Sequence, residues 1–229
     1  MMSTRAELES YFDRIGLPEA GRRLVEKARR ESPVRKVQSR LGNVLSHYPS
    51  RKMLRTVVAE SLHVEFPAFL QYEFDPDVLE YYPQPLMLDL RIADPFTKKV
   101  SRIQHTPDVL LLKRDCVCID EWREQARLEK LAAKHPDRFT RDGARWNCPQ
   151  VEAHLHEFGI QYRLRTADEH PGVLVENILF LKDYYMAGAH PVRDKALARI
   201  RECLAEHGAI TLGDLIELGK AIGSEQSHG

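Results

Sequence analysis

Two acidic residues and one basic residue flank a pair of short apolar runs near the middle of the chain. Asp108 comes directly before the run 109–112, and Glu121 and Arg123 follow the run 116–119. Carboxylate oxygens are ligands that Mg²⁺ prefers, and bound Mg²⁺ polarises a phosphate and lowers the pKa of an attacking water. A nearby cation stabilises the charge that develops on phosphorus. Residues of these types therefore suit cleavage of a phosphodiester bond.

The two apolar runs are predicted to pair as a hairpin, because only polar residues separate them. If Arg114 and Asp115 form a two-residue turn, Asp108 lies opposite Glu121, with Cβ atoms about 5 Å apart. Arg123 follows Glu121 by two residues, so it points to the same face. The turn has no Gly or Asn to fix this register, and a one-residue bulge would separate the carboxylates. The alternative interpretation is that these acids are solvated strand ends or members of surface ion pairs.

The elements that position these residues follow from the periodicity of apolar residues. A helical apolar spacing predicts helices over 6–12, 20–30, 57–72, 121–134, 149–158, 173–186, 193–206 and 212–222. Alternating or continuous short apolar runs predict strands over 78–82, 86–90, 109–112, 116–119 and 160–164. The chain is therefore predicted to be an α+β protein, with a mixed sheet flanked by helices in α/β/α layers. We divide it into an N-terminal helical segment (1–32), a core domain (33–188) and a helical tail (189–229).

A basic stretch precedes the predicted core strands. The whole chain carries 34 basic and 34 acidic residues, so its formal net charge is zero. Residues 33–59 nevertheless contain no acidic residue, and their basic residues are Arg35, Lys36, Arg40, Arg51, Lys52 and Arg55. Such a one-sided stretch suits contact with a DNA phosphate backbone, so we predict DNA binding here. The alternative is a solvated arm with scattered basic residues.

The composition argues against several classes of protein. The apolar content of 43% is that of a globular protein. No run approaches the ~20 apolar residues of a membrane-spanning helix. Residues 1–7 lack the apolar segment of a secretory signal, so we expect a cytoplasmic protein with no membrane partner. The four cysteines have the spacing of neither a zinc ribbon nor a disulfide framework, and Cys116 and Cys118 are interpreted as core residues.

A series of short motifs runs in order along the middle of the chain. They are SRKM at 50–53, ES at 60–61, EFDPDV at 73–78, YPQP at 82–85, TPD at 106–108, EWR at 121–123, ARL at 126–128, RF at 138–139, GIQYR at 159–163 and NILFLKDY at 177–184. Their order and spacing resemble those of the TnsA-like endonuclease subunits of heteromeric transposases, over about residues 50–185. The resemblance implies a restriction-endonuclease-like fold, with a short tail similar to a truncated winged helix.

The resemblance also implies roles for individual residues. In this family a helical Glu, the Asp of a Pro-Asp pair and the Lys of a Glu-x-Lys motif carry out Mg²⁺-dependent cleavage, for which Mn²⁺ can substitute. Carried over by position, it assigns Glu65, Asp108 and Glu121 to the metal and places Arg123 where the family has lysine. The implied partners are DNA at the transposon ends, an integrase-like transposase subunit and an ATP-dependent transposition regulator.

The chain departs from the family pattern around the catalytic residues. Arg123 keeps the charge of lysine but does not deprotonate at working pH. One extra residue between landmarks leaves two candidates for the helical acid, and we prefer Glu65 to Glu60 because the helix leads into the fixed turn at Asp75. The sequence thus predicts an Mg²⁺-dependent DNA endonuclease subunit. A catalytically impaired, DNA-binding structural adaptor is the alternative, and a different nuclease of the same fold is a third interpretation.

Overall fold

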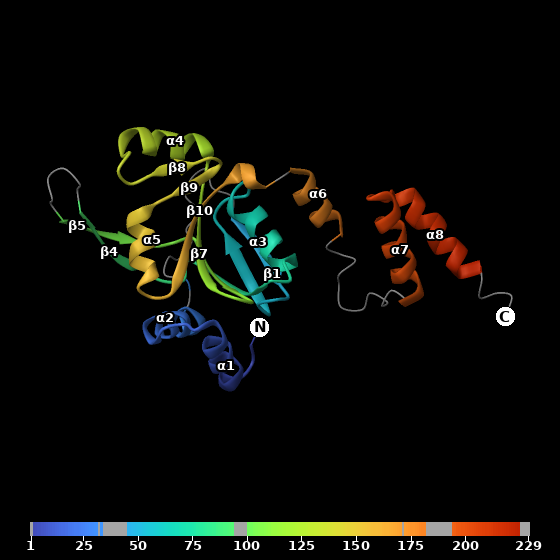
Figure 1. Cartoon of the computed structure of the whole chain (residues 1–229), viewed down its shortest axis with the longest axis horizontal. Helices are drawn as coiled ribbons and strands as arrows, with labels where there is room; N and C mark the ends of the chain where they lie inside the picture. The colour runs from blue at the N-terminus through green and yellow to red at the C-terminus, as the bar shows by residue number, and fades with distance from the viewer. Residues whose placement is uncertain are drawn as a thin grey trace. The chain divides into compact units, whose positions relative to one another are not determined.

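The computed structural model describes residues 2–31, 33, 45–93, 100–170, 172–181 and 194–224 (Figure 1). The chain divides into two compact units, Met1–Ile178 and Leu179–Gly229. The predicted boundary at residues 188–189 lies outside the described residues. Each unit is described by itself.

The first unit is built around a six-stranded mixed sheet. Its strands, in spatial order, are β3 (Val78–Pro83), β6 (Val109–Lys113), β7 (Val117–Arg123), β10 (Ile160–Thr166), β9 (Arg145–Asn147) and β8 (Thr140–Asp142). Strands β7 and β10 are parallel, and the other neighbours are antiparallel. The central strands are apolar and buried on both faces, because helices cover the sheet from both sides. The predicted α+β architecture, a mixed sheet flanked by helices, is confirmed.

Two N-terminal helices, α1 (Arg5–Ile15) and α2 (Glu19–Arg30), pack at the closed end of the β6–β7 hairpin (Figure 1). The hydroxyl of Tyr11 donates to the carbonyl oxygens of Lys113 (2.8 Å) and Cys116 (3.0 Å), on either side of the hairpin turn. Gly21 allows α2 to approach closely, since a Cβ there would lie 2.1 Å from the carbonyl oxygen of Phe158. Both helices match the prediction. The contacts of Tyr11 are made at the closed end of the hairpin and not at its open end.

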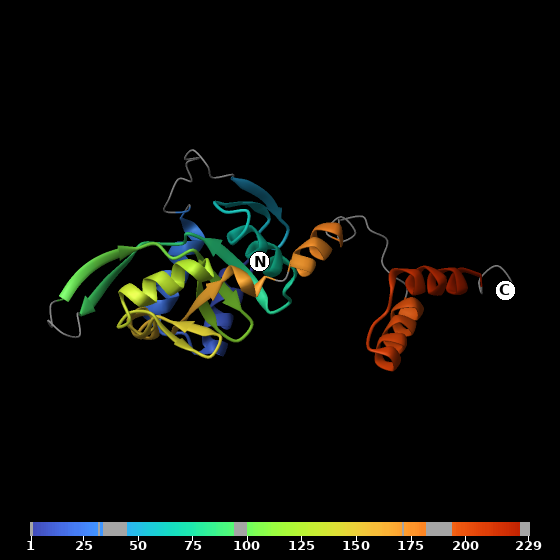
Figure 2. The ribbon, with the colours of Figure 1, turned by 90° about the horizontal axis from the view of Figure 1, so that it is seen from above.

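Further helices cover the two faces of the sheet (Figure 2). Helix α3 (Glu65–Phe74) packs on one face, where Tyr72 bonds to Asp120 of β7. Helices α4 (Gln125–Lys134) and α5 (Pro149–His156) lie on the other face, where their side chains line a small cavity together with Glu121. Successive residues of β7 thus point to opposite sides of the sheet.

The helix predicted over 57–72 is wrong in its first half. Residues Arg55–Ala59 form strand β2, which pairs with β1 (Ser46–Ser50) in an antiparallel hairpin. Three consecutive β-branched residues, Thr56, Val57 and Val58, favour a strand here. The helix starts only at Glu65.

Two other element boundaries differ from the prediction. Residues 121–123 extend β7, so the helix predicted from 121 begins at Gln125 instead. The strand predicted over 86–90 is β4 (Leu88–Ala93), and it pairs with β5 (Val100–His105), which the sequence did not predict. The β4–β5 ribbon extends away from the main sheet in both views (Figures 1 and 2).

The remaining helices lie where the sequence predicts helices. Helix α6 (Gly172–Leu181) falls within the strongly apolar stretch, and the second unit contains α7 (Asp194–His207) and α8 (Leu212–Ser224). Thr211 caps α8, since its hydroxyl accepts from the backbone N–H of Asp214 at 3.1 Å. The predicted linker at 188–192 lies outside the described residues. Among the helices described, none is both long and apolar enough to cross a membrane.

Candidate active site at the open end of the hairpin

The predicted register of the central hairpin is confirmed. Val109 pairs with Asp120 and Leu112 with Val117, which leaves Arg114 and its neighbour as the turn. One step beyond this ladder, the backbone N–H of Asp108 donates to Glu121 Oε2 at 3.3 Å. The backbone N–H of Trp122 donates to Asp108 Oδ2 at 2.7 Å. The two carboxylates therefore meet at the open end of the hairpin.

Arg123 bridges these carboxylates. Its Nη1 lies 3.2 Å from Asp108 Oδ2, and its Nη2 pairs with Glu121 Oε1. The exposed side-chain fractions are 2% for Glu121, 17% for Asp108 and 26% for Arg123, so the cluster is largely shielded from water. Nη1 also donates to the carbonyl oxygen of Trp122 at 2.7 Å, which fixes the plane of the guanidinium.

Glu65 reaches the same site from another element. It is the first residue of α3, and its carboxylate accepts from the backbone N–H of Glu60 at 2.6 Å. Glu60 is not helical but follows β2, and its side chain accepts from Gln84 Nε2 at 2.5 Å. A cavity of about 610 Å³ is lined by both acids together with His105, Asp108 and Arg123. The structure thus places the preferred helical acid beside the hairpin carboxylates.

The site gathers several carboxyl groups around the guanidinium of Arg123, and Arg127 also lines the larger cavity. Burial, and then the neighbouring charge of Glu121, raise the pKa of Asp108 far above its usual range, while Arg123 opposes the rise. Burial also raises the pKa of Glu65. A divalent cation would take the place of the proton that the raised pKa of Asp108 keeps on this cluster, and it would compensate the charge of the carboxylates. This oxygen-rich, electronegative donor set fits Mg²⁺ or Mn²⁺.

The side chains are not arranged as a ready-made metal site. Within the described ranges, no group of three or more His, Cys, Asp or Glu side chains has metal-binding geometry. Asp108 and Glu121 each direct one oxygen to Arg123 instead. The guanidinium would have to release at least one of them for both to ligate an ion.

His105 is a residue of this site that the sequence analysis missed. It ends β5, and its Nε2 lies 3.2 Å from Glu121 Oε2. That nitrogen is buried and has no hydrogen-bond partner among the described residues. A signal was present, because a histidine stands three residues before Asp108. Without β5 in the prediction, its ring could not be placed.

The opposite face of β7 carries a structural network. Asp120 is fully buried, and its Oδ1 accepts from Arg163 Nε at 2.6 Å while its Oδ2 accepts from the Tyr72 hydroxyl at 2.7 Å. Trp122 donates to the same hydroxyl at 2.7 Å and stacks on His170 with ring centroids 4.2 Å apart. The contacts of Trp122 are those of a core residue, and this network holds β7 against α3.

The basic stretch is described only in part. Arg35, Lys36 and Arg40 lie outside the described residues. Arg51 and Arg55 are exposed on the β1–β2 hairpin, and the Arg55 guanidinium lies 5.2 Å from the ring centroid of Tyr82.

Lys52 makes contacts inside the protein. Its Nζ donates to the carbonyl oxygens of Tyr72 and Asp75, each at 2.6 Å, at the end of α3. Burial lowers the pKa of Lys52. Neither Lys52 nor the exposed Arg51 and Arg55 is among the described residues that line the cavity.

Comparisons with known proteins assign no family to this chain. The chain matches no model of a known protein family, and no curated protein matches it. The chemistry assigned to the site therefore rests on the arrangement of its side chains and on the order of motifs in the sequence.

Proposed function

We propose that this chain is an Mg²⁺-dependent DNA endonuclease with a restriction-endonuclease-like fold, a TnsA-like subunit that cleaves DNA strands at transposon ends. The observation that carries the proposal is the meeting of Asp108 and Glu121 at the open end of the central hairpin, where Glu65 and Arg123 line the larger cavity together with Asp108. Phosphodiester hydrolysis needs such a combination of hard oxygen ligands and a phosphate-binding cation.

Each residue has a defined role in this proposal. Glu65, Asp108 and Glu121 hold the metal, which supplies an activated water and polarises the scissile phosphate when it is bound. Arg123 turns from the carboxylates to the phosphate and stabilises charge on the phosphorus. The backbone N–H of Trp122 keeps Asp108 aimed into the cavity. An integrase-like transposase and an ATP-dependent regulator are the proposed partners that bring DNA to the site.

A second candidate is an adaptor subunit that binds DNA but does not cut it. The pairing of Arg123 with both Asp108 and Glu121 favours this candidate, because it occupies oxygens that the metal needs. Arginine remains charged at any working pH, so deprotonation does not release the pair. The lysine of related nucleases presents a smaller ammonium group without the planar fork.

Nicking of transposon-end DNA in Mg²⁺ or Mn²⁺, with the partner subunits added, tests the proposal and separates the candidates. We expect the wild type to nick and Asp108→Ala to lose at least about 100-fold in rate, since the metal site loses a ligand. Asp115→Ala is the matched control, because it removes an exposed carboxylate from the closed end of the same hairpin. An inactive wild type that Arg123→Lys activates would establish the adaptor, and cutting by Asp108→Ala at the wild-type rate would overturn the proposed site.

A further inference from the structure

His105 presents a buried nitrogen to a buried carboxylate. Its Nε2 lies 3.2 Å from Glu121 Oε2, yet it forms no hydrogen bond with any described residue. A neutral ring nitrogen that carries no proton offers a lone pair, and so does the carboxylate oxygen. This contact is favourable when Nε2 carries a proton and pairs with the carboxylate, or when the proton lies on Nδ1 and a cation binds both lone pairs.

The spacing of these two atoms matches neighbouring ligands of one metal ion. In octahedral geometry with bonds of about 2.1 Å, adjacent ligand atoms lie about 3.0 Å apart. The separation of 3.2 Å between His105 Nε2 and Glu121 Oε2 is close to this value. Both residues line the smaller cavity under α4, and His105 also lines the larger cavity with Asp108.

The backbone holds His105 in place. It is the last residue of β5, where it pairs with Leu88 of β4, and Asp108 follows three residues later. Its side chain is 22% exposed, so the ring has one edge in the cavity and little freedom to turn away. A ligand carried on a strand end keeps its position better than one on a loop.

We propose that His105 is a ligand of the metal held by Asp108 and Glu121, and that it makes the site prefer Mn²⁺ to Mg²⁺. This inference rests on the proposed nuclease site. Mg²⁺ favours oxygen ligands alone, whereas imidazole nitrogen binds the later divalent metals more strongly. One nitrogen among carboxylates therefore shifts the preference without excluding Mg²⁺.

Isothermal titration of the full chain with Mn²⁺ and with Mg²⁺, in the absence of DNA, tests this inference. We expect the wild type to bind Mn²⁺ at least about tenfold more tightly than Mg²⁺. His105→Gln replaces the nitrogen ligand with an amide oxygen, so we expect Mn²⁺ affinity to fall about 10–100-fold while Mg²⁺ affinity changes less than about threefold. His63→Ala is the matched control, because His63 is exposed on the rim of the same cavity.

The outcomes separate this inference from the proposed function. If Asp108→Ala loses Mn²⁺ binding but His105→Gln and His105→Ala keep wild-type affinities, the metal site stands and His105 only pairs with Glu121. Equal losses of both metals in His105→Gln would also overturn the inference, because they indicate a structural role. If the wild type binds neither metal, or Asp108→Ala binds both as the wild type does, the proposed nuclease site itself fails.

Discussion

Arg123 makes contact with Asp108 and Glu121 together, so this one side chain decides which of the two carboxylates is available to a metal. Breaking such a buried pair leaves an unpaired carboxylate at a cost of about 3 kcal/mol. In the proposed cleavage, a scissile phosphate would give the guanidinium a replacement partner, and a divalent metal would give the carboxylates one. In the proposed site, bound metal would therefore compensate the carboxylates, and bound DNA would compensate the guanidinium that the opened pair releases.

The buried side chain of His170 makes the stability of the fold depend on pH. Burial, and then the charge of Arg165, lower its pKa from 6.5 to about 4. Because the folded state takes up a proton on this ring less readily than the unfolded chain, the contribution of His170 to stability is fully present above pH 6.5 and is lost as the pH drops toward 4. The free energy of unfolding falls between pH 7 and pH 4.5 in the wild type, and we expect this fall to be about 2 kcal/mol smaller in His170→Gln. Urea unfolding at the two pH values measures it.

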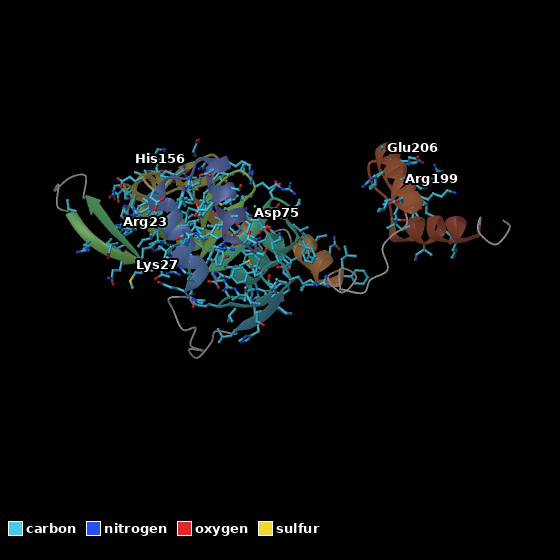
Figure 3. All side chains as sticks on the ribbon, turned by 90° about the horizontal axis from the view of Figure 1, so that it is seen from below. Arg23, Lys27, Asp75, His156, Arg199 and Glu206 are labelled. Atoms are coloured by element: carbon cyan, nitrogen blue, oxygen red, sulfur yellow. The ribbon has the colours of Figure 1, made fainter. Side chains whose placement is uncertain are left out.

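The matched control for His170 is His156→Gln. His156 is exposed at the end of α5, and Figure 3 shows it at the surface of the first unit. We expect this variant to keep the pH dependence of the wild type. An equal pH dependence in His170→Gln and the wild type would show that the buried ring does not set it.

At the scale of elements, the sequence predicted the parts whose signals are local. The register of β6 and β7 follows from two apolar runs and a two-residue turn, and it places Asp108 by Glu121 as expected. The helical spacing of Val58 and Leu62 predicts a helix where the structure has strand β2, because the pairing of β2 with β1 is not a local signal. The ring of His105 could not be placed because β5 depends on pairing with β4, which no local signal indicates. The bridging geometry of Arg123 is likewise a tertiary feature.

Helix α2 packs so closely on the turn before β10 that an added methyl group at Gly21 is expected to destabilise the fold. Gly21→Ala would place Cβ 2.1 Å from the carbonyl oxygen of Phe158, a rigid backbone atom. We expect a net loss of about 2 kcal/mol in unfolding free energy, because overpacking outweighs the gain of alanine in a helix. Urea unfolding followed by tryptophan fluorescence measures it, since Trp122 and Trp146 lie in this unit.

Gly219→Ala is the control for this substitution. Gly219 lies in α8 of the second unit, and no heavy atom stands within 4 Å of the position of its Cβ. We expect the tryptophan transition to keep its midpoint in this variant. A Gly21→Ala protein as stable as the wild type would mean that α2 does not pack closely on this turn.

At the scale of the whole molecule, a net charge of zero means that the proposed DNA binding would depend on local surfaces. Arg51 and Arg55 are the exposed basic residues of the β1–β2 hairpin. If they contact phosphates, Arg51→Gln and Arg55→Gln each weaken DNA binding several-fold and lower the slope of log K against log salt by about one. Fluorescence anisotropy with duplex DNA over a range of salt concentrations measures both quantities.

Matched controls for DNA binding come from helix α2. Arg23 and Lys27 are exposed on α2, which packs at the closed end of the central hairpin (Figure 3). Arg23→Gln and Lys27→Gln remove the same charge, and we expect both to keep the wild-type salt slope. Equal effects at all four positions would indicate nonspecific electrostatics and not a binding surface on the β1–β2 hairpin.

The proposed cleavage of DNA depends on Asp108 and Glu121 together. The most direct test maps the products of transposon-end DNA, labelled on each strand in turn, after incubation with the chain, its partner subunits and Mn²⁺. We expect nicks at the ends of the element with the wild type and none with Glu121→Gln, which keeps the size of the side chain but removes its charge. Identical nicks from both proteins, or no nick from the wild type and from Arg123→Lys alike, would contradict it.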